Sequence, residues 1–305
     1  MKQTLTVKNE KHFGIARKIV SNMTSESWET IPHAVVTYNP EVTELLKVLN
    51  EINQGSDKST KISINTVMLR VIVEGIKACP KMNSHIEFNR KLVRGCVKEF
   101  EEIHISMPMI LKTGEMMTVN IHDMHKKTMG EMRDKIADTV RRANNSDMNE
   151  VMFEVSLDNT LNGLKQGKIA QTVNRLVGSK TGKHRVKTLS GQAKKEYYST
   201  PESDRLTKHD IEQGTITVSN LGSVCRDWNG DCTLLEIIPP QVCAIAIGAI
   251  QKIAVVDDND EIKAGKKLPL TIAFDHRALD MGDIVPFINR LNEIFANPQV
   301  IKEWV

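Results

Sequence analysis

The chain has 305 residues, 40% of them hydrophobic and 26% charged, and its 41 Lys and Arg against 38 Asp and Glu leave a formal net charge of +3. Such a composition indicates a globular protein of the soluble class, long enough for one large domain or two ordinary ones. The near-balanced charge provides no global field for nucleic acid or a membrane surface, so we expect neither as a partner.

The start of the chain and its cysteines bear on where the protein works. The first twenty residues carry scattered charges and no apolar segment, which predicts no signal peptide, and no run in the chain has the uninterrupted apolar length of a membrane span. Five cysteines in no framework spacing suit reduced thiols, and no tight Cys/His pair marks a zinc site. We therefore expect a cytoplasmic protein without a metal.

Helices and short strands make up the first half of the chain. Apolar periodicity and stop signals such as Pro40 and Pro80 divide it into elements. The sequence predicts helices at 16–27, 41–53, 64–79 and 128–145, and strands at 33–40, 87–97, 101–111 and 116–121. The helix that ends before Pro80 is apolar almost all round, which is typical of a core helix.

Residues 146–205 differ from their surroundings. They hold two helical patterns, at 148–164 and 166–178, and then a basic segment from Gly178 to Lys195 that has six basic residues and no acidic one. The basic residues are Lys180, Lys183, Arg185, Lys187, Lys194 and Lys195. Two roles stay open: surface decoration, because loops absorb long insertions at little cost, or contact with coenzyme phosphates or an acidic carrier protein.

Strands dominate again after residue 207. The sequence predicts strands at 214–222, in two segments of 241–256 and at 268–277, followed by a final helix. Pro286 is predicted to lie in the first turn of that helix, where a proline is tolerated. The predicted buried face of the helix consists of Ile284, Ile288, Leu291 and Phe295.

The stretch TIAFDHRALDMGD, residues 271–283, holds the most concentrated chemistry. His276 follows a predicted strand, and Asp280 stands four residues later. A carboxylate at this spacing holds an imidazole in one orientation and one tautomer, and the imidazole is then a usable general base near neutral pH. For this pair alone, a structural histidine at a strand end is the more common alternative.

The wider pattern resembles the acyltransferase component of 2-oxo acid dehydrogenase complexes, the dihydrolipoyl acyltransferases. DHRALD at 275–280 is similar to that family's DHRxxDG, GTITVSNLG at 214–222 to its GTFTISNLG, and PPQVCAIAIG at 239–248 to its NPPQAAILAVG. Residues 16–38 and 61–84 are similar to its segments RKxxAxRMTxSxxxIPHFxxT and KxSxNDxxxKAxAxALxxxPxxNA. These five segments, in the family's order, cover most of the chain outside 146–205.

The resemblance implies an α/β (α+β) fold of the chloramphenicol-acetyltransferase-like kind, a mixed sheet with helices. It implies one acyltransferase catalytic domain over residues 1–305, with residues 146–205 as an insertion subdomain within it. It further implies a homotrimer whose active sites lie between subunits and in which an acyl group moves between coenzyme A and lipoamide. At the family's catalytic positions stand His276 as general base, Ser219 as donor to the oxyanion, and Asp280 as the residue that steadies the histidine.

Thiol chemistry suits these residue types. A thiol is only a few per cent ionised at pH 7, so a positioned base typically contributes about 10²- to 10⁴-fold in rate. One hydrogen-bond donor aimed at the oxyanion contributes roughly another 10²- to 10³-fold. For Ser219 without the resemblance, a hydroxyl that closes a strand-to-turn hydrogen bond is the favoured alternative.

The sequence departs from the family's pattern in the motif and in its domains. Met281 stands where DHRxxDG has glycine, and Gly282 comes one place later, which predicts a remodelled turn and a slightly displaced His276. No lipoyl or subunit-binding domain is recognised, so we expect the lipoyl group to be supplied by a separate polypeptide. The insertion at 146–205 is the third departure.

Two further functions stay open at this point. One is a catalytically weak or inactive trimeric scaffold at the core of a multienzyme assembly. The other is acyl transfer to a small acceptor, as in the related chloramphenicol acetyltransferases, but Asp275 stands where their HHxxxDG motif has its first histidine. The apolar ending Trp304 and Val305 is expected to join trimers into a larger cage.

Overall fold

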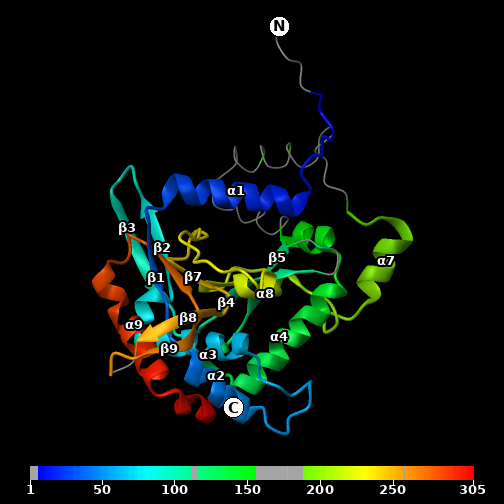
Figure 1. The fold of residues 1–305 in the computed structure, drawn as a ribbon. Coiled ribbons are helices and arrows are strands. Elements are labelled where there is room, and N and C mark those ends of the chain that lie inside the picture. The colour runs from blue at the N-terminus through cyan, green and yellow to red at the C-terminus, as the bar shows by residue number, and fades with distance from the viewer. Residues whose placement is uncertain are drawn as a thin grey trace. The chain divides into compact units, whose positions relative to one another are not determined.

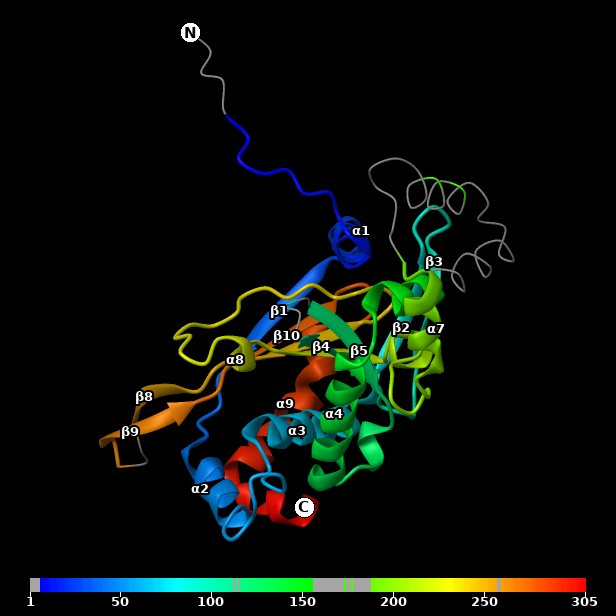
Figure 2. The same cartoon turned by 90° about the vertical axis from the view of Figure 1, so that its right-hand side faces the viewer.

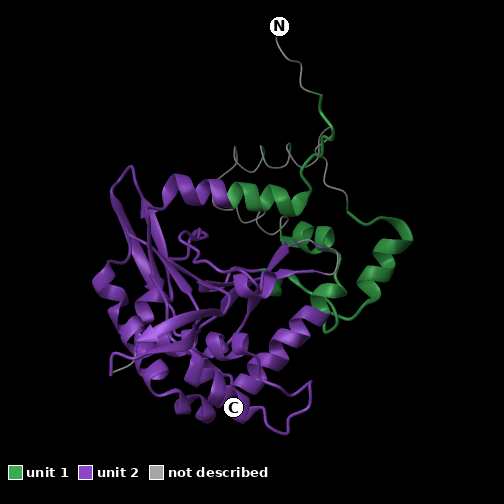
Figure 3. Ribbon diagram, viewed as in Figure 1, with its two compact units in different colours: residues 1–23, 142–211 green, residues 24–141, 212–305 purple. Residues whose placement is uncertain are grey.

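The computed structural model describes residues 6–111, 114, 116–155, 173, 177, 188–256 and 259–305. The chain divides into two compact units, and Figure 3 colours them separately. One consists of residues 1–23 and 142–211, and the other of residues 24–141 and 212–305. None of the helices in the described ranges combines the length and apolar character that a bilayer crossing requires.

A six-stranded mixed sheet forms the centre of the larger unit (Figure 1). The strands are β1 (His33–Tyr38), β4 (Ile105–Ile110), β5 (Met116–Ile121), β6 (Ile216–Asn220), β7 (Cys243–Ile247) and β10 (Leu270–Asp275). Their order is β1-β10-β7-β6-β4-β5, with β6 parallel to both β4 and β7 and the other pairs antiparallel. Each was predicted as a strand, and the mixed sheet is confirmed.

The two faces of this sheet differ in side-chain size. In one row across the sheet, Val218, Ile245 and Ile272 are paired neighbours. In the adjacent row, on the opposite face, Thr217, Ala244 and Ala273 are paired. The alanines of the second row pack in a buried cluster with Ile31 and Ile237, and helices α3 (Ile64–Ala78) and α9 (Met281–Ala296) lie on the other side of the sheet (Figure 2).

Helices α3 and α9 pack in close contact at Gly75. A Cβ at this position would lie 2.6 Å from side-chain atoms of Phe287 and Leu291. The buried residues of α9 are Ile284, Phe287, Leu291 and Ile294. The predicted face was therefore partly wrong: Ile288 and Phe295 are only half-buried, because the space that Gly75 leaves on α3 accepts Phe287. Pro286 is the sixth residue of α9, beyond its first turn.

Two antiparallel hairpins accompany the main sheet. One pairs β2 (Ser84–Asn89) with β3 (Arg94–Glu99), so the segment predicted as one strand at 87–97 is a hairpin with its turn at residues 90–93. The other pairs β8 (Gln251–Val256) with β9 (Ile262–Lys267). The sequence analysis missed β9, whose residues are mostly charged or small and mostly exposed.

Further helices of the described residues are α1 (Ile15–Thr30), α2 (Thr43–Ile52), α4 (Met129–Asn144), α7 (Gly191–Ser199) and α8 (Leu221–Val224). Turns of 3-10 helix occur at Pro80–Met82, Met124–Lys126, Lys208–Asp210 and Pro298–Trp304. The helices predicted at 16–27, 41–53, 64–79 and 128–145 correspond to α1, α2, α3 and α4.

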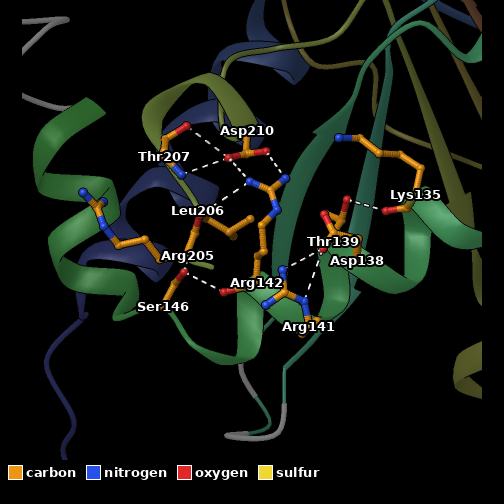
Figure 4. Close-up of polar contacts among 10 residues, drawn as sticks. All are labelled: Lys135, Asp138, Thr139, Arg141, Arg142, Ser146, Arg205, Leu206, Thr207 and Asp210. Carbon is orange, nitrogen blue, oxygen red and sulfur yellow. Dashed lines mark hydrogen bonds and ion pairs between the residues drawn. The ribbon is translucent and has the colours of Figure 1, made fainter. Parts of the chain in front are cut away.

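A buried ion pair fixes the smaller unit (Figure 4). Arg142 donates hydrogen bonds to both carboxylate oxygens of Asp210, and the one from Nη1 is 2.9 Å long. Both residues are buried. Thr207 donates to Asp210 through its backbone N–H at 2.9 Å and its hydroxyl at 3.1 Å. Burial alone would raise the pKa of Asp210, but the hydrogen bonds from Arg142 and Thr207 hold it below the ordinary value.

Of the predicted insertion at 146–205, the structure describes only part. Residues 148–155 are helical, in agreement with the first helical pattern. The second pattern, apart from residues 173 and 177, and the basic residues Lys180, Lys183, Arg185 and Lys187 lie outside the described residues. Lys194 and Lys195 lie on α7. The insertion thus stays a prediction.

Candidate active site

His276 occupies the turn between β10 and α9. Its backbone N–H donates to the carbonyl of Pro32 at 3.0 Å, which ties the turn to the residue before β1. The side chain is 55% exposed. An imidazole in this position is accessible to a substrate from outside the chain.

Asp280 lies next to the imidazole ring. One of its carboxylate oxygens is 3.1 Å from His276 Nδ1. Asp280 immediately precedes α9, where aspartate is a favoured residue because it satisfies free backbone N–H groups of the first helical turn. With Nδ1–H donated to this carboxylate, the lone pair of Nε2 is left to accept a proton.

Asp275 and Arg277 hold the turn from the other side. Asp275 is fully buried and accepts two side-chain hydrogen bonds from Arg277, Nε at 3.0 Å and Nη2 at 2.6 Å, and one from its backbone N–H at 2.9 Å. The Arg277 guanidinium also lies 5.9 Å from the centre of the Phe88 ring on β2. The sequence analysis quoted both charged residues without a role, although a carboxylate at the end of an apolar strand signals a buried partner.

Ser219 lies elsewhere in the sheet. It is the fourth residue of β6 and is half-buried. The hydrogen bond that closes the turn after β6 is accepted by Asn220, whose Oδ1 takes the N–H of Ser223 at 2.8 Å. Within the described residues the Ser219 hydroxyl has no hydrogen-bond partner. The alternative of a turn-closing serine is therefore not what the structure has.

The strand register separates Ser219 from His276 within one chain. Ser219 pairs with Ala246 of β7, and Ala246 pairs with Thr271 of β10. His276 follows Thr271 by five residues, about 16 Å along the strand, while Ser219 is two strands away, about 10 Å across the sheet. The structure thus brings His276 and Asp280 together and leaves Ser219 apart from them.

Met281 stands at the motif position where the family has glycine. It is half exposed, at the first position of α9. A Cβ at Gly282 would meet no atom within 4 Å, so the turn does not depend on glycine there. The contact between His276 and Asp280 is kept with methionine in place of the family's glycine.

The sequence analysis expected no metal, and the structure does not test that expectation directly. In the described parts of the chain, no three His, Cys, Asp or Glu side chains are arranged to hold a metal ion. Residues that bind a coenzyme were not predicted individually. Of the two described basic residues of the basic segment, Lys194 lies 3.7 Å from the buried Glu150.

Comparison with known proteins identifies the family. The profile of the 2-oxoacid dehydrogenases acyltransferase (catalytic domain) family matches residues 5–156 and 182–302. A dihydrolipoyllysine-residue acetyltransferase component of the pyruvate dehydrogenase complex from Rickettsia prowazekii is 23% identical over 285 residues, 92% of this chain and 52% of the relative. The corresponding mitochondrial protein of Saccharomyces cerevisiae is 21% identical over 92% of this chain and 45% of the relative.

Solved structures show the same fold. The dihydrolipoamide acetyltransferase of Azotobacter vinelandii has a TM-score of 0.66 at 15% identity and covers 99% of this chain and 100% of that one. The cubic core of a pyruvate dehydrogenase multienzyme complex has a TM-score of 0.67 at 14% identity, with 99% and 100% covered. The chain spans about half the length of the curated relatives it matches. This chain belongs to the 2-oxoacid dehydrogenases acyltransferase (catalytic domain) family.

Proposed function

We propose that this protein transfers an acyl group between a thioester donor and a thiol acceptor, with coenzyme A and a dihydrolipoyl group as the two thiols. The observation that carries the proposal is the half-exposed His276 with a carboxylate 3.1 Å from Nδ1. The relatives support the choice of substrates, since they are dihydrolipoyllysine-residue acetyltransferases.

The reaction follows from these groups. Nε2 of His276 accepts the proton of the attacking thiol, and the thiolate adds to the thioester carbonyl. The hydroxyl of Ser219 donates a hydrogen bond to the oxyanion of the tetrahedral intermediate. When the carbon–sulfur bond to the leaving thiolate breaks, the imidazolium returns its proton to that sulfur, so no other reactant is consumed. Asp280 stabilises the imidazolium through Nδ1–H.

A named relative agrees with this assignment of residues. The study of the Azotobacter vinelandii enzyme concerns the catalytic role of a serine, a histidine and an asparagine four residues after the histidine. This chain has Asp280 at that spacing from His276. A carboxylate in place of an amide keeps the hydrogen-bond acceptor for Nδ1–H and adds a negative charge beside the imidazolium.

We propose that the working site forms between two copies of the chain in a homotrimer. The separation of His276 and Ser219 in one sheet supports this, because a second copy can place its own Ser219 beside His276. The cubic core among the similar structures is consistent with a larger cage. Trp304, expected to help build such a cage, is buried and lies 5.5 Å from Arg70 of its own chain, so only Val305 of that ending is exposed.

The lipoyl group is proposed to come from a separate lipoylated carrier protein. The acyl group is not specified by the residues described above. A cytoplasmic location stays a prediction, because the relatives include both bacterial and mitochondrial proteins.

The test is an assay of the purified protein with acyl-CoA donors of increasing chain length and dihydrolipoamide as acceptor. We expect turnover with at least one donor and a fall of about 10²- to 10⁴-fold on His276→Ala. No turnover with any donor would contradict the proposal and favour a trimeric scaffold without activity. Turnover unchanged in His276→Ala would refute the assigned base.

A further inference from the structure

Asp283, in the first turn of α9, is held by the segment that follows α3. Its carboxylate accepts a hydrogen bond from Lys81 Nζ at 2.6 Å, and its backbone carbonyl accepts one from Cys79 Sγ at 3.0 Å. Its second carboxylate oxygen accepts the backbone N–H of Asp280 at 2.9 Å. The side chain of Asp283 thus connects Lys81 to Asp280, the residue that contacts the catalytic histidine.

The contact with Asp280 is one half of a capping box: the side chain of Asp280 in turn accepts the backbone N–H of Asp283, and the Asp280 carbonyl accepts that N–H at 3.0 Å. The Asp280 carboxylate, 3.1 Å from His276 Nδ1, belongs to a side chain that is 77% exposed. An exposed side chain keeps one orientation only if its backbone is fixed and its rotamer is tied to a partner. The backbone N–H of Asp280 is fixed by Asp283, and the carboxylate is tied to the histidine ring.

Asp283 is suited to this task by its charge. The hydrogen bond from the Asp280 N–H and then the one from Lys81 hold the pKa of Asp283 below its ordinary value of 3.8. The side chain therefore stays an ionised acceptor at neutral pH, and an ionised acceptor binds a backbone N–H more strongly than a neutral one.

We propose that Asp283, oriented by Lys81, is a positioning residue for the acyl transfer reaction. It acts through Asp280: fixing the backbone at Asp280 sets the position of the carboxylate, and the carboxylate sets the direction in which Nε2 of His276 faces the thiol. Asp283 touches no reacting atom. This inference rests on the proposed function, since it presumes that His276 is the base.

A purely structural role for this pair predicts a different outcome. The Lys81 side chain is 58% exposed and that of Asp283 27%, and an ion pair in such surroundings contributes little to stability. Removing it would then change neither stability nor turnover appreciably. Positioning of a catalytic group is more sensitive, because a displacement of about 1 Å can lower the rate about 10²-fold.

The experiment compares kcat and KM for both thiols in Asp283→Ala, Asp283→Asn, Lys81→Met and Lys81→Arg. We expect Asp283→Ala to lower kcat about 10- to 100-fold with KM changed less than about threefold. Asp283→Asn keeps an acceptor for the Asp280 N–H and should lose less kcat than Asp283→Ala. Lys81→Arg keeps the positive charge and should lose less kcat than Lys81→Met. Lys77→Met removes a comparable pair with Glu74 on α3, 2.9 Å apart, and should leave kcat unchanged.

A double-mutant cycle separates positioning from general destabilisation. In an Asp280→Ala background, Asp283→Ala should cause no further loss of kcat, because its only route to His276 is gone. Losses that multiply, or a normal kcat in Asp283→Ala, would overturn the inference. If thermal unfolding shows that Asp283→Ala does not fold, Lys81→Met, at an exposed position, is the variant that tests the inference. A kcat of Lys81→Met equal to that of Lys77→Met would then overturn the inference. An inactive wild type would instead refute the proposed function.

Discussion

Thr271 and Ser219 flank Ala246 on its two sides in the central sheet. Thr271 lies on β10, five residues before His276. Ser219 is therefore level with the start of β10 in the sheet, whereas His276 lies in the turn after its end. We therefore propose that a site that uses both side chains is built from two chains. The proposals on activity and assembly depend on this register.

The first prediction is complementation between two inactive variants. Co-expressed His276→Ala and Ser219→Ala chains should regain activity, because a site between them can take the histidine from one and the serine from the other. In a cyclic trimer, each mixed assembly has one intact site of three, and random mixing at equal amounts should restore roughly a quarter of wild-type turnover.

The measurement is the specific activity of co-purified mixtures against their composition. Each variant alone should remain at least about 100-fold below wild type. Mixtures no more active than the separate variants would place both residues in the site of one chain, contrary to the register.

The second prediction concerns the buried carboxylate beneath the turn that carries His276. Arg277→Met should lower the free energy of unfolding by about 3 kcal/mol, because it leaves Asp275 buried without its cation. Urea denaturation measures the change. Asp275→Asn combined with Arg277→Met should be less destabilised than Arg277→Met alone, since no uncompensated charge is left; an equal or larger loss would count against an electrostatic cause.

The third prediction concerns the smaller unit and the pair in Figure 4. Arg142→Met should cost about 3–5 kcal/mol, because Asp210 is buried and its carboxylate loses its cation. Arg142 lowers the pKa of Asp210 below its ordinary value of 3.8. The stabilisation is therefore present above about pH 3.8 and is lost as the pH falls through the lowered pKa.

The loss of stability is measured by thermal unfolding and by the rate of limited proteolysis within residues 142–211. The control is Arg141→Met, which removes an exposed ion pair with Asp138, 2.8 Å apart, and should cost less than about 1 kcal/mol. Equal effects of the two substitutions would show that burial of the Arg142 pair is not what stabilises this unit.

The fourth prediction is a loss of stability in mild acid. Burial, with a smaller contribution from Lys98, lowers the pKa of His85 from 6.5 even though a hydrogen bond to the carbonyl of Gly214 opposes the change. The unfolded chain therefore takes up this proton at higher pH than the folded chain, and the free energy of unfolding falls as pH drops from about 6.5 to the lowered pKa.

Denaturant titrations between pH 7.5 and 5 measure this dependence. In His85→Phe the ring against Phe100 is kept, and the Gly214 carbonyl keeps its hydrogen bond from Gln241 at 2.7 Å. The slope with pH should become shallower in this variant. An unchanged slope would assign the acid sensitivity to other groups, such as His125, whose pKa burial also lowers.

The elements of the larger unit were predictable where their own residues decide their form. Alternating and continuous apolar runs indicated β1, β7 and β10, because buried strands need such side chains. β9 was missed because Lys263, Lys266 and Lys267 make it polar, and only its pairing with β8 makes it a strand. Phe287 was missed because its burial depends on Gly75 in another helix.

The candidate site was predictable to the extent that it is local in the chain. His276 and Asp280 are four residues apart, and local spacing was enough to bring them together. The ion pair of Lys81 and Asp283 joins segments about two hundred residues apart, and the periodicity of apolar residues in the sequence does not indicate such a contact. The distance from His276 to Ser219 depends on strand register across three strands, which the residue pattern does not encode.

The proposed base, His276, and the proposed oxyanion donor, Ser219, lie at different levels of one sheet, and this placement has a kinetic consequence. Catalysis then depends on protein concentration. Chains diluted until they dissociate would keep their secondary structure and near-native spectra while losing turnover, and concentrating them again would restore it. Specific activity would rise with enzyme concentration before reaching a plateau, and the midpoint of that curve would report the association constant of the assembly.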